Sequence, residues 1–130
     1  MVTGFSALAH SDGDVVIHAL VDALLGAMGW GDIGERFPND DPQWKGAASR
    51  VFLESVLADV RRAGYRVANA DVTVLAERPK LKVYKKEIAA CLAAMIEAPV
   101  NVKAGTNEGC DAVGRGRAIA AHAVVLLHRA

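Results

Sequence analysis

Three polar side chains, Asp14, His18 and Asp22, recur every fourth residue through an otherwise apolar stretch of the chain. On an α-helix this spacing places them in one stripe, each side chain one turn from the next. An imidazole between two carboxylates suits a metal ligand whose neighbours fix its tautomer. The stripe therefore predicts a metal site on this helix.

The start of the same predicted helix offers a second feature. Ser11 or Asp12 is expected to cap the helix, which places His10 at its positive N-terminal end. Free backbone N–H groups and the helix dipole make such an end a place for a phosphate group.

A purely structural interpretation competes with this chemistry. A lone histidine on an apolar helix is more often a core residue bonded to a neighbour than a metal ligand. Residues 10–22, however, hold two histidines and three carboxylates, and each would cost stability if buried without a partner. This density favours a functional site.

Composition limits the other function classes. The 130 residues predict one domain with a proper core, residues 1–130. Fifteen basic and fifteen acidic residues cancel, which argues against a general nucleic-acid binder, since such a protein needs a basic face. The hydrophobic fraction of 52% is high, and extra apolar surface in a small domain often lies in subunit contacts.

The same composition gives expectations about location. Two cysteines are too few for a disulfide framework, which predicts a reducing compartment such as the cytoplasm. The sequence has no eighteen-residue uncharged apolar run, so no membrane span or membrane partner is expected. The first residues have neither the basic lead nor the apolar core of a signal peptide.

Helices and strands alternate along the predicted chain. Helices are expected over residues 14–28, 49–63 and 84–97, the first two ending at Gly29 and Gly64. Strands are expected over 67–75 and 100–104, and turn-forming residues predict loops over 30–42 and 105–116. The tail, 118–128, is ambiguous, because Ala and Leu favour helix while its apolar residues also alternate with period two. The order predicts an α/β or α+β fold.

Five motifs carry a resemblance to a known family: HSDGDVVIHALVDALLG, GDIGERFPNDDPQWKGAASR, DVTVLAERPKL, NVKAGTNE and GRGRAIA. In this order and spacing, from His10 to the C-terminus, the chain resembles the 2-C-methyl-D-erythritol 2,4-cyclodiphosphate synthases of the non-mevalonate isoprenoid pathway. The resemblance implies a reaction in which the 2-phosphate of 4-diphosphocytidyl-2-C-methyl-D-erythritol 2-phosphate attacks the β-phosphate. The products are a cyclic diphosphate and CMP, and such a step needs charge neutralisation and positioning above all.

The resemblance also implies metal ions and catalytic residues. His18 matches a ligand of a zinc ion that sits on one phosphate, and Glu108 matches the carboxylate that holds a second ion. Mg²⁺ or Mn²⁺ suits that second position, because both prefer oxygen ligands. His10 and Thr106 match the pair that stabilises the transition state.

Further matches imply the residues that bind substrate. They lie at the start of the first helix, in the Asp-Ile-Gly segment, in a loop over the erythritol, in a cytidine pocket, after the second strand and near a three-fold axis. Singly, each is explained as well by an ordinary turn residue; in order and in register, the functional interpretation is favoured. They are Ser11, Asp32, Gly34, Phe37, Pro38, Asn39, Asp40, Asp41, Ala76, Pro79, Lys80, Leu81, Gly105, Asn107 and Arg115.

The resemblance implies the assembly as well. The family fold is a ferredoxin-like layer of helices on a mixed sheet, with the sheets of a homotrimer facing a three-fold axis. Active sites lie between adjacent subunits, and the tail is a strand. Because Arg117 stands beside Arg115, a trimer would gather six arginines at the axis, and we expect an anion there.

One departure from the family keeps an alternative open. The family carries an Asp-x-His segment with two more zinc ligands, and then a β-hairpin, before the motif that begins at His10. Only nine residues precede His10 here, and Asp-x-His occurs nowhere in the sequence. The alternative is a non-catalytic trimer of the same fold that binds cytidine nucleotides or diphosphates. Zinc bound tightly at His18 would favour the enzyme.

Overall fold

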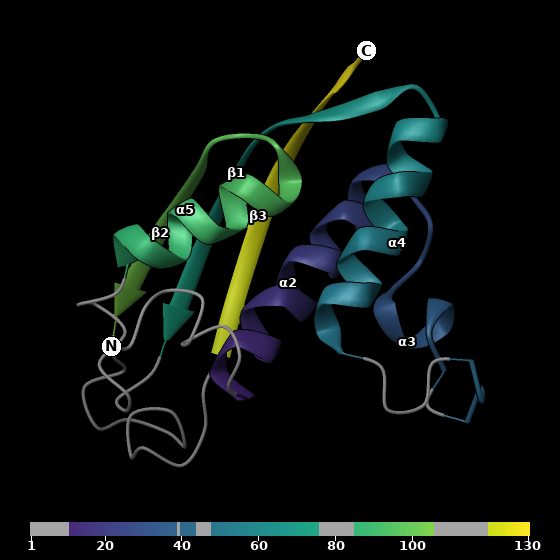
Figure 1. The fold of residues 1–130 in the computed structure, drawn as a ribbon, viewed down its shortest axis with the longest axis horizontal. Helices are drawn as coiled ribbons and strands as arrows, with labels where there is room; N and C mark the ends of the chain where they lie inside the picture. The colour runs from purple at the N-terminus through teal and green to yellow at the C-terminus, as the bar shows by residue number, and fades with distance from the viewer. Residues whose placement is uncertain (1–10, 39, 44–47, 76–84, 106–119) are drawn as a thin grey trace.

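The structure, a computed structural model, describes residues 11–38, 40–43, 48–75, 85–105 and 120–130. Figure 1 shows the arrangement of the helices and strands. In chain order they are α2 (Ser11–Met28), α3 (Ile33–Arg36), α4 (Ser49–Arg62), β1 (Tyr65–Leu75), α5 (Lys85–Ile96), β2 (Val100–Gly105) and β3 (Ala120–Arg129).

The three strands form one mixed sheet in the order β2-β1-β3. β1 runs parallel to β2, with Val72 opposite Val102, and antiparallel to β3, with Val72 opposite Ala123. An irregularity between Val67 and Asn69 shifts the register of the β1–β3 pair. The predicted mixed α/β fold, with helices on a mixed sheet, is confirmed.

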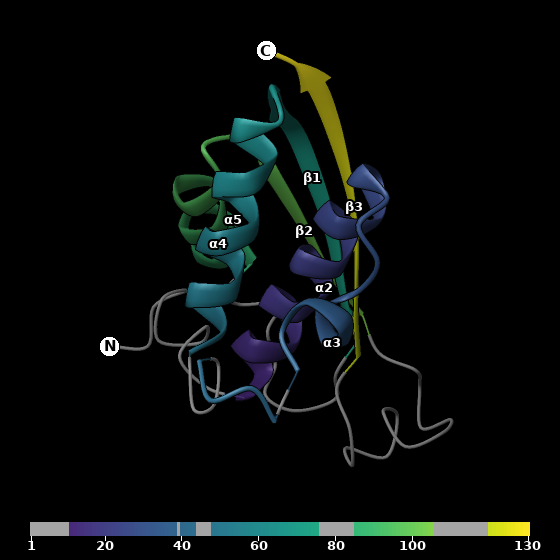
Figure 2. The same ribbon diagram turned by 90° about the vertical axis from the view of Figure 1, so that its right-hand side faces the viewer.

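One face of the sheet carries the core. Val72 and Val74 of β1 are buried on this face, where they join Leu20 and Leu24 of α2 and Leu53 of α4 in one apolar cluster. α4 and α5 lie on the same side of the strands (Figure 2). Burial of this apolar surface is the main force that holds the helices on the sheet.

The other face of the sheet is open as far as the described residues are concerned. Val124 and Leu126 of β3 are 71% and 61% exposed, because alternate residues of a strand point to opposite faces. In the neighbouring strands, Asp71 pairs with Lys103 at 2.7 Å and accepts a hydrogen bond from Asn101 at 3.0 Å. Two large apolar side chains thus stand exposed beside a charged cluster.

The predicted helices and strands are present with small shifts at their ends. Gly29 (φ 71°) and Gly64 (φ 90°) follow the ends of α2 and α4 in the left-handed conformation that glycine adopts most easily. The tail is the strand β3, as the resemblance implied and against its local helix propensity. No described helix is long and apolar enough to cross a membrane.

Two local predictions were wrong. The prediction of loop over 30–42 missed α3, a helix of four residues, which Asp32 caps by accepting a hydrogen bond from the Glu35 N–H at 2.8 Å. The capping prediction for α2 placed the helix start too late. Helix α2 begins at Ser11, so Ser11 and Asp12 belong to its first turn.

Candidate active site

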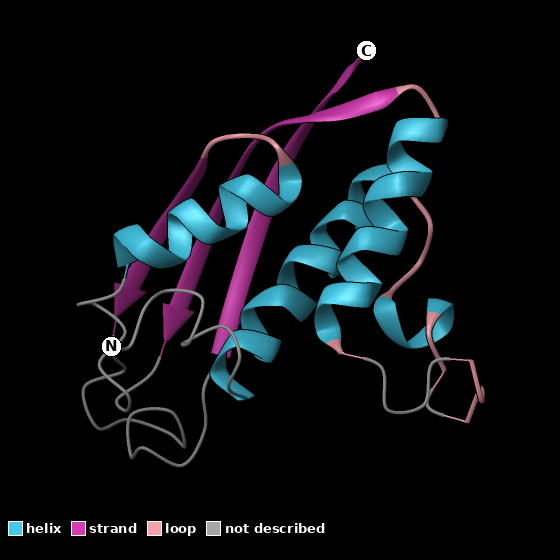
Figure 3. Ribbon diagram, in the orientation of Figure 1, coloured by secondary structure: helices cyan, strands magenta, loops and turns pink. Residues whose placement is uncertain are grey.

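The elements that position the predicted site residues meet at one end of the molecule. The first turns of α2 and α4 lie at the same end as the carboxyl ends of β1 and β2 (Figure 3). Leu75 and Gly105, the last residues of the two parallel strands, are register partners. The two parallel strands therefore end at neighbouring positions of the sheet.

A hydrogen-bonded group of three side chains joins α2 to α4 at this end. The Ser49 hydroxyl, at the first residue of α4, donates to Oδ1 of Asp14 over 2.6 Å. The Oγ of Ser49 also lies 3.3 Å from Nε2 of His18. Ser49 is 7% exposed, while His18 is half-buried. Two members of the predicted stripe, Asp14 and His18, are thus connected through a residue of another helix.

Aromatic rings support the other side of His18. The Phe52 ring of α4 lies 6.3 Å from the imidazole, centroid to centroid, at an angle of 37°. Phe37 stacks on Phe52 with a centroid separation of 4.5 Å and is itself only 5% exposed. Phe37 was predicted in a loop over the substrate. Its ring packs in the protein and connects that loop to His18 through Phe52.

Asp22, the third member of the stripe, has a different partner. Its Oδ1 accepts a hydrogen bond from the Ile33 N–H at 2.8 Å, and it thereby holds the first residue of α3 against α2. Asp22 was predicted to help to orient His18; in the structure its Oδ1 is bonded to α3, whereas Asp14 is connected to His18 through Ser49.

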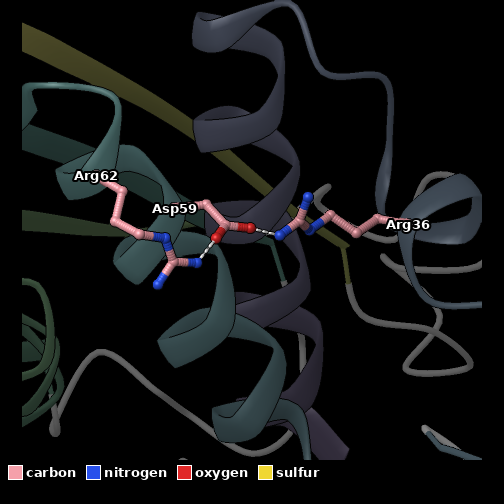
Figure 4. Close-up of polar contacts among 3 residues, drawn as sticks. All are labelled: Arg36, Asp59 and Arg62. Atoms are coloured by element: carbon pink, nitrogen blue, oxygen red, sulfur yellow. Dashed lines mark hydrogen bonds and ion pairs between the residues drawn. The ribbon is translucent and has the colours of Figure 1, made fainter.

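A bridge of charges fixes the far end of α3. Arg36, the last residue of α3, forms an ion pair with Asp59 of α4, and Asp59 also pairs with Arg62 (Figure 4). Arg36 in addition lies over the Phe37 ring, 5.7 Å from its centroid. Asp59 and Arg36 are less than one third exposed, so the bridge holds the 32–37 segment in place beside α4.

The predicted substrate-binding residues of the 32–41 segment surround this short helix. The Asp32 carboxylate caps α3, and Gly34 lies exposed within it. Asp41 donates its N–H to the Pro38 carbonyl at 3.1 Å and accepts from the Gln43 N–H at 2.9 Å, which makes a tight turn. Asp40 is exposed at this turn.

The remaining predicted site residues lie mostly outside the described part of the chain. Gly105 is described as the end of β2, and Ser11 is placed only as the first residue of α2. Those outside are His10, Asn39, Ala76, Pro79, Lys80, Leu81, Thr106, Asn107, Glu108 and Arg115. Their roles stay predictions.

The donor chemistry at His18 fits one ligand of a zinc ion. Its Nε2 faces Ser49, and no partner is assigned to Nδ1 within the described ranges, so that atom can face a cation. Zinc accepts imidazole nitrogen readily but takes four ligands in all. No three His, Cys, Asp or Glu side chains of the described residues form a group that could hold a metal ion.

Ser49 is the residue beside His18 that sequence reasoning missed. It is the one polar or charged residue that is buried among those described, and its partners are 31 and 35 residues away in the sequence. A serine at the start of an amphipathic helix is ordinary, so the local sequence gave no signal. The motif that contains it, GDIGERFPNDDPQWKGAASR, was the available indication.

The family is decided by comparison with known proteins. The model of the YgbB family matches residues 2–128. The chain belongs to the YgbB family. It is 52% identical over 128 residues to the 2-C-methyl-D-erythritol 2,4-cyclodiphosphate synthase of Stutzerimonas stutzeri, covering 96% of this chain and 82% of the relative.

Two further relatives place this YgbB-family chain among the same proteins. A chloroplastic synthase of Arabidopsis thaliana is 48% identical over 122 residues, which cover 92% of this chain and 53% of the relative. The chain thus matches about half the length of the plant protein. A solved 2C-methyl-D-erythritol-2,4-cyclodiphosphate synthase in a CDP-bound form superposes with a TM-score of 0.79 at 36% identity, over 86% of this chain and 74% of that one.

Proposed function

We propose that this chain is a 2-C-methyl-D-erythritol 2,4-cyclodiphosphate synthase. It converts 4-diphosphocytidyl-2-C-methyl-D-erythritol 2-phosphate to 2-C-methyl-D-erythritol 2,4-cyclodiphosphate and CMP. The observation that carries the proposal is the 52% identity to a named synthase over 96% of the chain. The hydrogen-bonded arrangement of Asp14, His18 and Ser49 supports it.

The reaction makes one phosphorus–oxygen bond and breaks another. An oxygen of the 2-phosphate bonds to the β-phosphorus, and the bond from that phosphorus to the oxygen bridging to the α-phosphate breaks, so that CMP leaves. The protein must hold the two phosphates in line and offset their negative charge. The N-terminal end of α2, a helix of 18 residues, supplies partial positive charge and free N–H groups for this purpose.

Metal ions form the finer part of the proposal. His18 would hold a zinc ion through Nδ1, and Glu108 would hold Mg²⁺ or Mn²⁺. Such ions supply charge neutralisation and polarisation of the phosphate oxygens. His10 and Thr106 are proposed to stabilise the transition state, and the substrate-binding residues keep the roles that the resemblance implies.

The assembly is proposed to be a homotrimer with the open sheet face turned to the three-fold axis. Val124 and Leu126 are 71% and 61% exposed on that face, and a subunit contact would bury these two apolar side chains. The CDP-bound relative supports a cytidine nucleotide as ligand, which we place between adjacent subunits. We further propose an anion at the axis, near Arg115 and Arg117, and a location in the cytoplasm, or in the plastid of a plant or alga.

One experiment tests the enzyme and the metal together. Purified protein is analysed for zinc by mass spectrometry, and CMP release from the cytidine-diphosphate substrate is followed with added Mg²⁺. We expect about one zinc per chain and CMP release. Protein that holds no zinc and binds CMP without turnover would overturn the synthase proposal in favour of the non-catalytic trimer.

A further inference from the structure

The hydrogen atom of the Ser49 hydroxyl determines which nitrogen of His18 faces the site. The Ser49 Oγ lies 2.6 Å from Oδ1 of Asp14, which is in the range of an O–H···O⁻ hydrogen bond to a carboxylate. A carboxylate can only accept, and a serine hydroxyl has one hydrogen to donate. The hydrogen of Ser49 is therefore directed to Asp14.

The contact with His18 must then run in the opposite direction. The Ser49 oxygen has only lone pairs left for Nε2 of His18, 3.3 Å away. In a neutral imidazole one nitrogen carries hydrogen and the other accepts. Nε2 can bond to Ser49 only if it carries the hydrogen, which leaves the lone pair on Nδ1.

We propose that Ser49, oriented by Asp14, is a positioning residue that holds His18 in the Nε2-protonated tautomer and keeps Nδ1 as the electron-pair donor. Asp14 is exposed, but Ser49 itself is 7% exposed, so water competes little for its hydroxyl. The proposal rests on the proposed function only for what Nδ1 binds, namely zinc.

The tautomer itself is the first readout. The full chain is labelled with ¹⁵N-histidine, stripped of metal with a chelator and studied by long-range ¹H–¹⁵N correlation NMR in alkaline buffer. The signals of His18 are assigned from their loss in His18→Gln. We expect the wild-type imidazole to carry its hydrogen on Nε2, and a hydrogen on Nδ1 would overturn the proposal.

Substitution of Asp14 gives the sharper prediction. In Asp14→Ala the Ser49 hydroxyl is free to donate to Nε2, so we expect the hydrogen of His18 to move to Nδ1. Asp14→Asn keeps an acceptor oxygen for Ser49 and should keep the wild-type tautomer. Asp22→Ala removes the other carboxylate of the stripe and serves as the matched control. An Asp14→Ala variant that keeps hydrogen on Nε2 would overturn the proposal.

A titration with zinc alone, in competition with a chromophoric chelator, is the second readout. Loss of a group that orients a metal ligand typically weakens affinity 10- to 100-fold. We expect a loss of about this size in Asp14→Ala and Ser49→Ala, and rescue in Asp14→Asn and Ser49→Thr. Equal zinc affinity in all of these variants would count against the positioning role.

The two readouts separate this inference from the proposed function. A wild-type chain that takes up no zinc, while Asp14→Ala still inverts the tautomer, would remove the metal from the proposed function and support the positioning of His18. Zinc uptake with the same tautomer in wild type and Asp14→Ala would leave the synthase proposal intact and overturn the role of Asp14 and Ser49.

Discussion

Two neighbouring turns of α2 carry the same residue type for different purposes. Asp14 and Asp22 each lie one helical turn from His18, one before it and one after it. Asp14 accepts from the buried hydroxyl of Ser49, which in turn contacts the imidazole. Asp22 accepts from a backbone N–H of α3 and holds the next segment of the chain.

The difference shows that spacing on one helix does not assign a role to a carboxylate. The role depends on which other element arrives beside it, here the first residue of α4 or the first residue of α3. Substitution of Asp14 should therefore change the chemistry at His18, whereas substitution of Asp22 should change stability without changing that chemistry.

The largest effect is expected at the residue between the two carboxylates. His18→Ala should reduce CMP release by about 100-fold or more, the size of effect seen when one group that stabilises developing charge is lost. Zinc should be lost as well. The measurement is steady-state CMP release with metal analysis, and circular dichroism serves as the control for folding. Full turnover in this variant would remove His18 from the site.

A pair of variants at Asp14 and Asp22 tests the comparison directly. Asp22→Ala removes the acceptor for the Ile33 N–H and should lower the free energy of unfolding by about 1 kcal/mol, as is typical of one hydrogen bond. Zinc affinity should stay at the wild-type value. Asp14→Ala should weaken zinc affinity by about 10- to 100-fold, in addition to the stability cost of the lost Ser49 hydrogen bond. Urea unfolding and zinc titration of both variants measure this, and equal effects of the two would contradict the division of roles.

The charge bridge at the end of α3 should contribute slightly less to the free energy of unfolding. Asp59→Ala removes the shared partner of Arg36 and Arg62, and we expect a loss of up to about 1 kcal/mol in urea unfolding, since partly exposed ion pairs contribute little. Arg36→Ala should match it. Arg62→Ala is the control and should cost less, because Arg62 is 72% exposed. A larger loss of stability in Arg62→Ala than in Arg36→Ala would contradict the contribution of the Arg36–Asp59 pair.

The smallest effect concerns a third carboxylate, on the open face of the sheet. Hydrogen bonds from Lys103 and Asn101 hold the pKa of Asp71 below its ordinary value of 3.8. A lowered folded-state pKa adds stability above the unfolded value, and that stability is lost as the pH falls through 3.8 and then through the folded value. The stability difference between wild type and Asp71→Asn should therefore shrink in acid. A difference that is constant from pH 7 to pH 3 would contradict this.

Most of the fold could be predicted from local sequence. Apolar periodicity and the glycines at 29 and 64 located α2 and α4, since helix ends depend on nearby residues. Local sequence alone did not predict β3, because its alanines and leucines favour helix. Its pairing with β1 and the burial of one face overrode that preference. The short helix α3 was missed because its cap, Asp32, is also an ordinary turn residue.

The candidate site was predicted less completely, for a physical reason. His18 and Asp14 were found because their spacing lies within one helix. The residue that connects them, Ser49, comes from another helix 31 residues away from His18. Contacts over such separations are created by packing, so one sequence contains no local record of them. For the same reason, the sequence alone could not distinguish the role of Asp14 from that of Asp22.

The stack of Phe37 on Phe52, and of Phe52 beside His18, has a thermodynamic consequence. A ligand that displaces Phe37 is expected to disturb the ring that supports the imidazole and so to change the affinity of His18 for a cation. Coupling free energies are reciprocal. The cation would then change the affinity of the Phe37 segment for that ligand by the same factor. The total free energy of binding the cation and the ligand would not depend on the order in which they bind.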